Sequence, residues 1–541
     1  AIVALTAAQS RQEDLVGAQI DLAYARGRSG KAEQLAEAKQ VLQGLIEVPQ
    51  GAPDPAGRAE HARAALWLAD LTLRADPQAR AAARELLTKA QTLAPPSDVL
   101  FQEELAQARL RIGDGEPAAA IARELVTRLP QRRTSRILLA RALVAAKQGS
   151  DALTALGPLI EGKDKTAKGA LDAEAQLLRA QALFLTHDTL AAQQVTRQII
   201  AATPGGSSEH VGAQLLAGEL FLKLGEPVSA RRSLEPLVRQ LDKLKEGGEG
   251  GKPAGGSRTS HEQRLHIQLL WARTLLAMRP PQQAEARALL ESVVAASPDN
   301  AEAHYLLGRL LRELGVLGPA EQQLTAAVRD DDHLTSARRE LAGLLMLRGE
   351  FGKAHELYTE LLKAEKDNEL LIAAARAERL DSAPEKALTT LLNVHRQTGE
   401  IAGKFDEELL AERARALLLV ERGGEVVNLL GGPAGDLGQL KKPTLVALLI
   451  RAHVSLAEGS QQKPELAAAR ALLGKLPKPM LPDFDVRLAE AELLRAEGKR
   501  ADSAQVLNAL VASLQTLPPT SSGEETALRQ HAQRLLEAKK N

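Results

Sequence analysis

The feature that most constrains this chain is a set of small and leucine residues that returns after 34 positions. The first copy comprises Leu307, Gly308, Leu311, Gly315, Ala320, Leu324 and Ala327, and the second comprises Leu341, Ala342, Leu345, Gly349, Ala354, Tyr358 and Leu361. A fixed period of about 20 to 50 residues is typical of proteins built from stacked supersecondary units. Such a chain has no single globular core, because each unit buries its apolar face against its neighbours.

Each unit is predicted to be a pair of antiparallel helices. Gly308 and Ala320 are small where two helices must approach closely, and Leu324 fills the layer between them. Gly315 and Gly349 are predicted to end the first helix, since glycine readily takes the left-handed conformation found there. Composition agrees: aromatic residues are only 2% of the chain, whereas Ala and Leu, which favour helices, dominate a hydrophobic content of 44%.

This helix–turn–helix pattern resembles the tetratricopeptide repeat, in a divergent form that we associate with bacterial proteins. Weaker copies extend in both directions. Their first helices are marked by small residues at Ala69, Ala106, Ala140, Ala180, Gly218, Ala272 and Ala375. The resemblance implies an all-α fold, a right-handed α-solenoid superhelix of about thirteen stacked helix–turn–helix pairs.

The repeats suggest a division into five parts. Residues 1–245 form an N-terminal solenoid half, 246–258 a Gly-rich loop or linker, 259–400 the best-matching units, 401–522 degenerate pairs, and 523–541 a C-terminal capping helix. The Gly-rich segment is either a hinge or a surface loop. We favour continuous stacking across it, because lengthening a loop costs little free energy.

In the degenerate C-terminal region, glycines are expected to close the first helices of three pairs. These residues are Gly423, Gly459 and Gly498. The solitary amphipathic helix after them would cover the last apolar face of the stack, as repeat arrays require.

Charge and cysteine content exclude several classes of protein. The 69 basic residues equal the 69 acidic ones, so the basic surplus expected of a non-specific nucleic-acid binder is missing. The chain has no cysteine, which excludes disulfides, thiol catalysis and cysteine-based zinc sites. We therefore expect protein partners and no nucleic acid.

Several motifs that could carry chemistry are incomplete. Lys252 is followed by Pro253 where a phosphate-binding loop needs Ser or Thr. His355 has Thr359 one turn later, where a zinc-protease helix needs a second histidine. The run of three aspartates from Asp330 lacks the alternation and glycine of a calcium loop, and is predicted to be a solvated turn.

No catalytic, cofactor-binding or metal-binding residue is therefore predicted, and the chain is expected not to be an enzyme. An enzyme whose residues converge from distant repeats is kept as an alternative. The arginines of segment 131–136 and Arg338–Arg339 are interpreted as solvated helix surface; a receptor for a carboxylate-bearing peptide is the second interpretation.

The resemblance also implies which residues face the concave groove: the second, fifth, ninth and twelfth positions of each unit. The candidate partner-binding residues are Arg141, Gln181, Phe184, Glu219, Glu302, Tyr305, Arg309, Arg312, Arg339 and Met346. The same positions include Val144, Leu177, Leu215, Leu222, Ser336 and Gly343. Tyr305 with the nearby arginines is a candidate recognition patch, because Tyr and Arg are frequent binding hot spots; alternatively, Tyr305 packs on its neighbour.

The leading functional prediction is a non-enzymatic scaffold that binds a partner protein, or an extended segment of one, along the concave surface. By resemblance only, the alternative is a cell-envelope assembly component of a secretion, polysaccharide-export or surface-motility machine. Self-association through the solenoid ends is a further possibility.

The apolar opening from Ala1 to Ala8 is far shorter than the roughly 20 residues of a membrane span. We interpret it as the first turn of a helix, or as the remnant after a signal peptide or anchor. A periplasmic or envelope location is favoured over the cytoplasm.

Overall fold

The structure is a computed structural model. It describes residues 16–29, 31–46, 55–76, 79–95, 97–161, 172–246, 261–331, 334–365, 367–398, 404–431, 442–457, 462–476, 483–516 and 523–537. Across these ranges the chain forms 27 helices, α2 to α28, and no strand. The chain divides into two compact units, Ala1–Ala286 (unit 1) and Arg287–Asn541 (unit 2).

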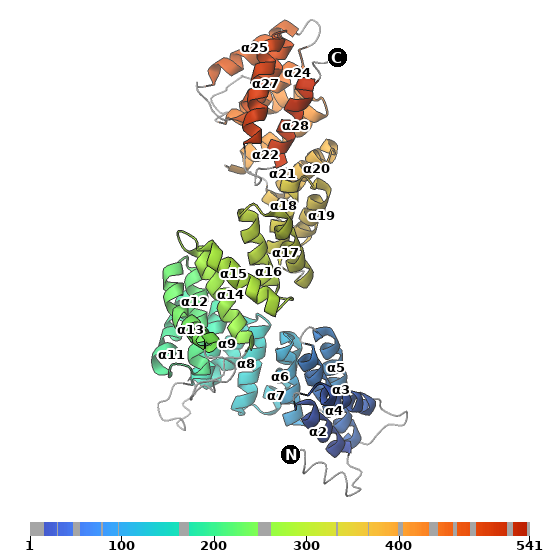
Figure 1. The fold of residues 1–541 in the computed structure, drawn as a ribbon, viewed down its shortest axis with the longest axis vertical. Helices are drawn as coiled ribbons and strands as arrows, with labels where there is room; N and C mark the ends of the chain where they lie inside the picture. The colour runs from blue at the N-terminus through green and yellow to red at the C-terminus, as the bar shows by residue number, and fades with distance from the viewer. Residues whose placement is uncertain are drawn as a thin grey trace. The chain divides into compact units, whose positions relative to one another are not determined.

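Unit 1 contains six successive helix pairs and the first helix of a seventh (Figure 1). They are α2 (Val16–Gly27), α3 (Ala32–Ile46), α4 (Pro55–Ala75), α5 (Arg80–Leu93), α6 (Val99–Arg111), α7 (Gly115–Arg128), α8 (Arg133–Ala145), α9 (Gly149–Glu161), α10 (Ala173–Leu185), α11 (Thr189–Ala202), α12 (Ser208–Lys223), α13 (Pro227–Glu246) and α14 (His261–Ala277). Helix α15 (Gln283–Ala296) crosses the boundary between the units.

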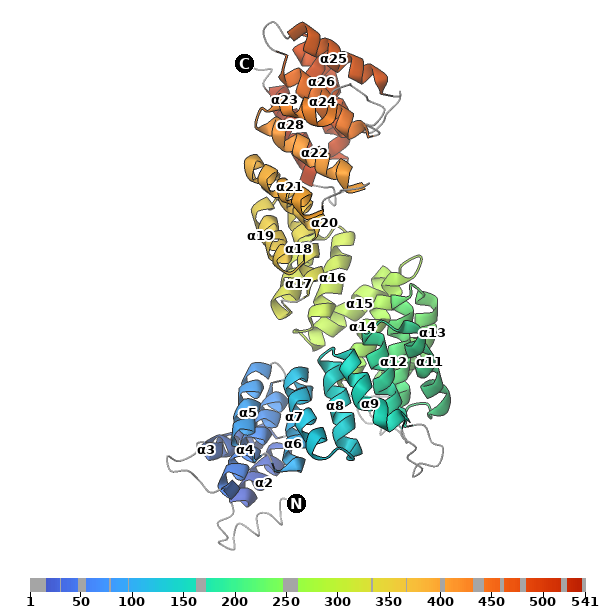
Figure 2. The same ribbon diagram turned by 180° about the vertical axis from the view of Figure 1, so that it is seen from behind.

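Unit 2 continues with six further pairs and a final single helix (Figure 2). They are α16 (Ala301–Glu313), α17 (Leu317–Asp330), α18 (Thr335–Arg348), α19 (Phe351–Ala364), α20 (Asn368–Leu380), α21 (Pro384–Thr398), α22 (Lys404–Leu419), α23 (Gly423–Gly431), α24 (Pro443–Ser455), α25 (Gln462–Lys475), α26 (Phe484–Ala496), α27 (Arg500–Gln515) and α28 (Gly523–Glu537).

The helices stack as a repeat array does. Within each unit, helices adjacent in the chain pack on one another, and many of the even-numbered helices, which come first in each pair, also contact the even-numbered helix of the next pair. In unit 1 this second series runs from α2 through α14, and in unit 2 it joins α16 to α18 and runs from α20 through α28. The predicted all-α solenoid is therefore confirmed, with α2 to α27 forming thirteen successive pairs in the described chain. The right-handed superhelix stays a prediction.

The predicted small residues lie where two helices touch. A Cβ atom on Gly308 would lie 2.7 Å from Cγ of Leu324, and Ala320 is fully buried between the same helices. Gly218 has the same relation to Leu234 at 2.8 Å. No larger side chain fits at these positions unless the helices separate, so a small residue is a geometric requirement of the hairpin.

Two of the predicted helix-ending glycines behave as expected, with φ of 76° at Gly315 and 78° at Gly349. Among the three glycines predicted to close helices in the C-terminal region, Gly498 also takes the left-handed conformation, with φ of 83°. Gly459 lies outside the described residues. The prediction for Gly423 is wrong: Glu421 takes the left-handed conformation, and Gly423 begins α23. Gly423 is small because a Cβ there would lie 3.2 Å from the carbonyl oxygen of Ala452 on the next helix.

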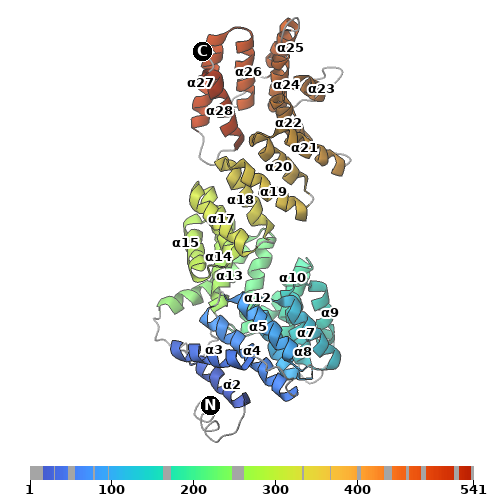
Figure 3. The same ribbon diagram turned by 90° about the vertical axis from the view of Figure 1, so that its right-hand side faces the viewer.

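The C-terminal helix α28 lies beside α26 and α27 (Figure 3). Ala532 is fully buried in this packing, and Leu528 and Leu535 pack against the same cluster. Helix α28 also approaches α18 and α20, two first helices distant in sequence. It thus covers the end of the stack and part of its inner face.

Other parts of the prediction fall outside the described chain. The opening residues 1–8 and residues 247–258 of the Gly-rich segment are among them. None of the described helices has the length and apolar character needed to cross a membrane.

Gly308→Ala should destabilise unit 2 by about 1–3 kcal/mol, because the added methyl group enters the volume of Leu324. Gly343→Ala is the matched control, since a Cβ at this mid-helix position meets nothing nearer than Arg312 Nη1 at 3.5 Å. The control should be neutral or stabilising by up to about 1 kcal/mol, through helix propensity. Denaturant midpoints of the full chain test this; equal midpoints for the two variants would contradict the close-approach argument.

Candidate functional site

The first helices of unit 1 enclose an open pocket of about 440 Å³, which we call the unit 1 groove. Its lining comes from α8, α10, α12 and α14 and comprises Val144, Leu177, Gln181, Phe184, Leu185, Ser208, Gly212, Leu215, Leu216, Glu219, Gln263 and His266. Six of the positions predicted to face the concave surface are among them: Val144, Leu177, Gln181, Phe184, Leu215 and Glu219. Residues that the sequence places at equivalent positions of successive repeats therefore line one pocket in the structure.

Close packing of two helices forms part of the groove's apolar surface. A Cβ on Gly212 of α12 would lie 2.7 Å from Cδ2 of Leu177 on α10, so a larger residue there would displace the end of this leucine side chain. Leu215 and Leu216 follow Gly212 by about one turn and are largely buried. The result is a rigid hydrocarbon surface framed by first helices.

Polar groups of different kinds border this surface. His266 Nε2 lies 3.1 Å from Glu219 Oε1, and Lys223 Nζ lies 4.6 Å from the centre of the Phe184 ring. The side chain of Gln181 makes no hydrogen bond to any described residue. Its amide can therefore both donate a hydrogen bond to a bound chain and accept one from it.

The patch predicted around Tyr305, in unit 2, is held by internal contacts. The pKa of Arg309 lies above its ordinary value. Burial lowers this pKa, but the hydrogen bonds to Tyr305 and Glu313 raise it by more than burial lowers it. Arg312 Nη1 lies 2.8 Å from Glu340 Oε2, and Met346 is largely buried.

The other candidates outside the groove are also engaged. Arg339 Nη2 lies 2.9 Å from Glu365 Oε2, and in unit 1 Arg141 Nη2 lies 2.6 Å from Glu174 Oε1. Glu302 is half-buried and also has a polar partner. The unit 1 groove is the better candidate for binding, because it brings several of the predicted positions together in one pocket.

Unit 2 has a larger pocket of about 1090 Å³ on its first helices and α28. Arginines from five helices line it: Arg348, Arg379, Arg415, Arg451 and Arg534. The middle three recur at intervals of 36 residues, a regularity that our sequence analysis missed. The 36-residue interval could have revealed this row of arginines in the sequence, because an interval close to the length of one repeat brings each arginine to the same level of successive first helices.

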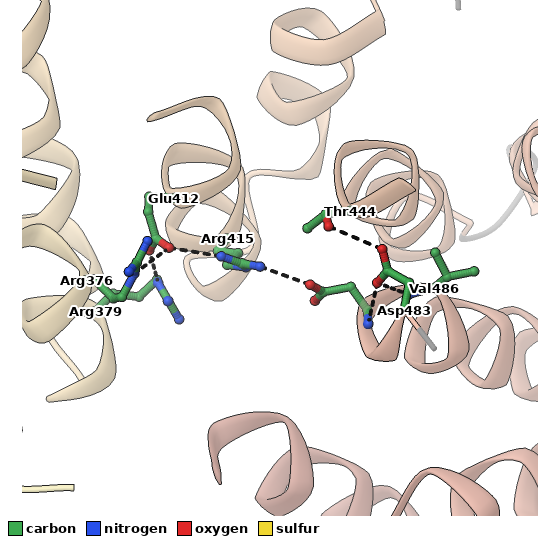
Figure 4. A network of polar contacts seen from close by, with 8 residues as sticks. Arg376, Arg379, Glu412, Arg415, Thr444, Asp483 and Val486 are labelled. Carbon is green, nitrogen blue, oxygen red and sulfur yellow. Dashed lines mark hydrogen bonds and ion pairs between the residues drawn. The ribbon is translucent and has the colours of Figure 1, made fainter. Parts of the chain in front are cut away.

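Buried carboxylates pair with two of these arginines, Arg379 and Arg415 (Figure 4). Glu412 is 1% exposed and accepts hydrogen bonds from Nε of Arg376 and Nε of Arg379, both at 3.0 Å, and from Nη1 of Arg415 at 2.9 Å. Arg415 also donates to Asp485 Oδ2 at 2.9 Å. Burial raises the pKa of Glu412, but the three guanidinium groups outweigh it and bring the pKa to about 2.

A second carboxylate, the half-buried Glu492, connects α28 to the same lining. Glu492 Oε2 accepts from Arg451 Nε at 2.9 Å, and Glu492 Oε1 lies 2.9 Å from Nε2 of His531 on α28. Burial raises the pKa of Glu492, and Arg451 and His531 more than offset it, so the pKa is below its ordinary value. Ion pairs through Glu412, Asp485 and Glu492 thus join α20, α22, α24, α26 and α28 within unit 2.

The incomplete motifs have local roles. His355 Nε2 lies 3.1 Å from Glu378 Oε1, and Asp330 Oδ1 lies 2.8 Å from Arg329 Nε. Arg132 and Arg133 pair with carboxylates of neighbouring first-helix segments. Among the described residues, no group of three His, Asp or Glu side chains could hold a metal ion.

Comparison with known proteins agrees with the repeat assignment. Residues 282–333, which span α15 to α17, match a family model described as tetratricopeptide repeat. The chain therefore contains a tetratricopeptide repeat in that segment, as predicted. A search of curated protein sequences finds no match.

Three solved structures are similar at low sequence identity. Human IFIT1, solved as a dimer with PPP-AAAA, has 13% identity and a TM-score of 0.41, covering 82% of this chain and 95% of its own. Pseudomonas aeruginosa pilF has 16% identity and a TM-score of 0.35, covering 45% and 100%. A tetratricopeptide repeat protein from Parabacteroides merdae has 14% identity and a TM-score of 0.32, covering 52% and 98%. The bacterial source and the envelope location stay predictions.

The Glu412 network should make unit 2 acid-sensitive. The pKa of Glu412 is about 2 in the folded chain against 4.5 as the ordinary value. Because the folded pKa is depressed, the stabilisation is complete above pH 4.5 and is lost as the pH falls from 4.5 toward 2. The loss should be about 3 kcal/mol, as the pKa difference implies.

Glu412→Gln should remove this pH dependence and cost about 3–5 kcal/mol at neutral pH, since it leaves buried guanidinium groups without a counter-charge. Glu408→Gln on the same helix, a half-buried residue, should change stability by less than about 0.5 kcal/mol. Denaturant unfolding between neutral and acidic pH measures both; an unchanged acid profile in Glu412→Gln would refute the assignment.

Proposed function

We propose that this chain is a non-enzymatic scaffold that binds an extended segment of a partner protein in the unit 1 groove. The observation that carries the proposal is the convergence of six register-predicted residues on one pocket formed by four successive first helices. The tetratricopeptide repeat in residues 282–333 supports a protein-binding role by resemblance.

The groove has the chemistry that an extended peptide needs. Leu177, Phe184 and Leu215 offer hydrocarbon and aromatic surface for the apolar side chains of the segment. An extended backbone also presents N–H and C=O groups that lose water on binding and must find partners. The amide of Gln181 supplies both a donor and an acceptor for them.

The large pocket of unit 2 fits this role less well. Arg379, Arg415 and Arg451 of its lining pair with carboxylates of the same chain. These three side chains are only 6%, 16% and 18% exposed, so they offer little surface to an acidic group of a partner. The ionic network therefore serves the stability of unit 2, and binding is assigned to the unit 1 groove.

Site-specific photo-crosslinking in the full chain tests the groove. A photoreactive amino acid replaces Gln181 in the groove or, as control, Gln198, which is exposed on the second helix α11. In extracts of the source cell, the Gln181 position should capture a discrete partner that the Gln198 position does not. Equal capture at both positions would contradict a groove-specific partner.

Phe184→Ala should reduce that capture about tenfold, because aromatic anchors in a groove contribute strongly to affinity. The matched control is Leu190→Ala, which removes a side chain that is 76% exposed on α11. It should leave capture unchanged. Circular dichroism checks that both variants keep their helices; loss of capture in Leu190→Ala alone would assign binding to the second-helix face.

A further inference from the structure

Two of the chain's five Tyr and Trp residues stack on each other at the start of unit 1. The rings of Tyr24 on α2 and Trp67 on α4 have centroids 4.5 Å apart and planes 18° apart. Both helices are first helices, and both side chains are half-buried. In a chain that is 2% aromatic, this pairing is a concentrated recognition surface of the kind that hot spots use.

Arginines cover the outer faces of the two rings. Arg63 Cζ lies 4.8 Å from the centre of the Trp67 ring, and Arg28 Cζ lies 5.6 Å from the centre of the Tyr24 ring. Since each ring occupies one face of the other, the guanidinium groups take the remaining faces. The order of the stack is Arg63, Trp67, Tyr24, Arg28.

A buried carboxylate organises the arginines at one end of this stack. Asp70 is 8% exposed; its Oδ2 accepts from the Tyr24 hydroxyl at 3.0 Å and from Arg74 Nε at 2.9 Å. Its Oδ1 accepts from Arg111 Nη1 of α6 at 2.6 Å. Two guanidinium groups, those of Arg74 and Arg111, thus share the single buried carboxylate of Asp70, and Arg28 lies over the neighbouring Tyr24 ring.

Two guanidinium groups at this end are partly exposed. The side chains of Arg74 and Arg111 are 45% and 57% exposed. The indole N–H of Trp67 donates to no described residue. At the other end Asp21 pairs with Arg63 at 2.8 Å, and Glu60 lies one turn before Arg63. A partner that meets the arginine end must therefore bring acceptors and negative charge.

We propose that Tyr24, Arg28, Arg63, Trp67, Arg74 and Arg111, the aromatic–arginine cluster, form a docking surface for an acidic segment of a partner protein. The proposal rests on the scaffold function above and adds the chemistry of the partner. An acidic protein segment fits better than a nucleic acid, because the outer ring faces on which bases would stack are covered by guanidinium groups.

A direct binding experiment uses a fluorescently labelled glutamate-rich peptide and the full chain. Its comparison probes are the glutamine analogue of the same peptide and an oligothymidylate of equal charge. Fluorescence anisotropy should show that the glutamate peptide binds more tightly than either, with affinity falling as salt rises. In a Trp271→Phe background, where Trp67 is the one remaining tryptophan, binding should also change the indole emission.

Variants locate the site. Arg28→Gln with Arg111→Gln should weaken glutamate-peptide binding about tenfold, whereas Arg28→Gln alone should weaken it about threefold. The matched control is Arg197→Gln, a change of the same charge at an exposed residue of α11, which should have no effect. Circular dichroism shows whether the double variant is folded. If it is not, the single variant Arg28→Gln still tests the proposal, because Arg28 is exposed and its replacement should leave the fold intact.

Three results would overturn the proposal: equal binding of the glutamate and glutamine peptides, equal loss in Arg28→Gln and Arg197→Gln, or tighter binding of the oligothymidylate. If any of these occurs while the Gln181 position still captures a partner, the cluster is excluded and the unit 1 groove stands. If peptide binding meets expectation and capture at Gln181 fails, the acidic docking surface stands without the groove.

Discussion

The structure depends on the distance at which two antiparallel helices can meet. At Gly308 and Leu324, and again at Gly218 and Leu234, one side chain must be absent so that a leucine can enter the gap. This contact joins the helices of one pair. The leucines on either side of it then meet the next pair, because a helical hairpin leaves apolar surface that it cannot cover alone. A small residue repeated at nearly regular intervals is therefore required for a stack of hairpins, together with the leucines that join neighbouring pairs.

The same construction explains why the fold was predictable from the sequence and why some details were not. Gly315 and Gly349 end their helices as predicted, because a left-handed residue follows directly from the local chain. Gly423 failed as a helix end because its small size serves a tertiary contact with Ala452, which local sequence does not reveal. A glycine near a helix boundary has two physical explanations, and only the neighbouring helix decides between them.

The candidate groove was predictable to a similar extent. Register places Gln181 and Glu219 on the same face of successive first helices, and the structure brings them to one pocket. The Tyr24–Trp67 stack could not be found in this way, since it depends on the contact between α2 and α4. The pairing of Arg415 with Asp485, which are 70 residues apart, could not be predicted from the sequence either. The 36-residue spacing of the arginines, in contrast, can be read directly from the sequence.

Divergence of the repeats gives one architecture several local chemistries. Positions on the inner faces of first helices need only avoid the close contacts, so their side chains can change without altering the stack. In α10 and α12 they are Leu177, Phe184 and Leu215, which line an open and largely apolar pocket. In α20 to α24 they include Arg379, Arg415 and Glu412, whose charges satisfy one another. A scaffold gains binding capacity where inner-face residues are left without partners and gains stability where they pair, so an array of uneven repeats can hold a partner in one region while remaining rigid in another.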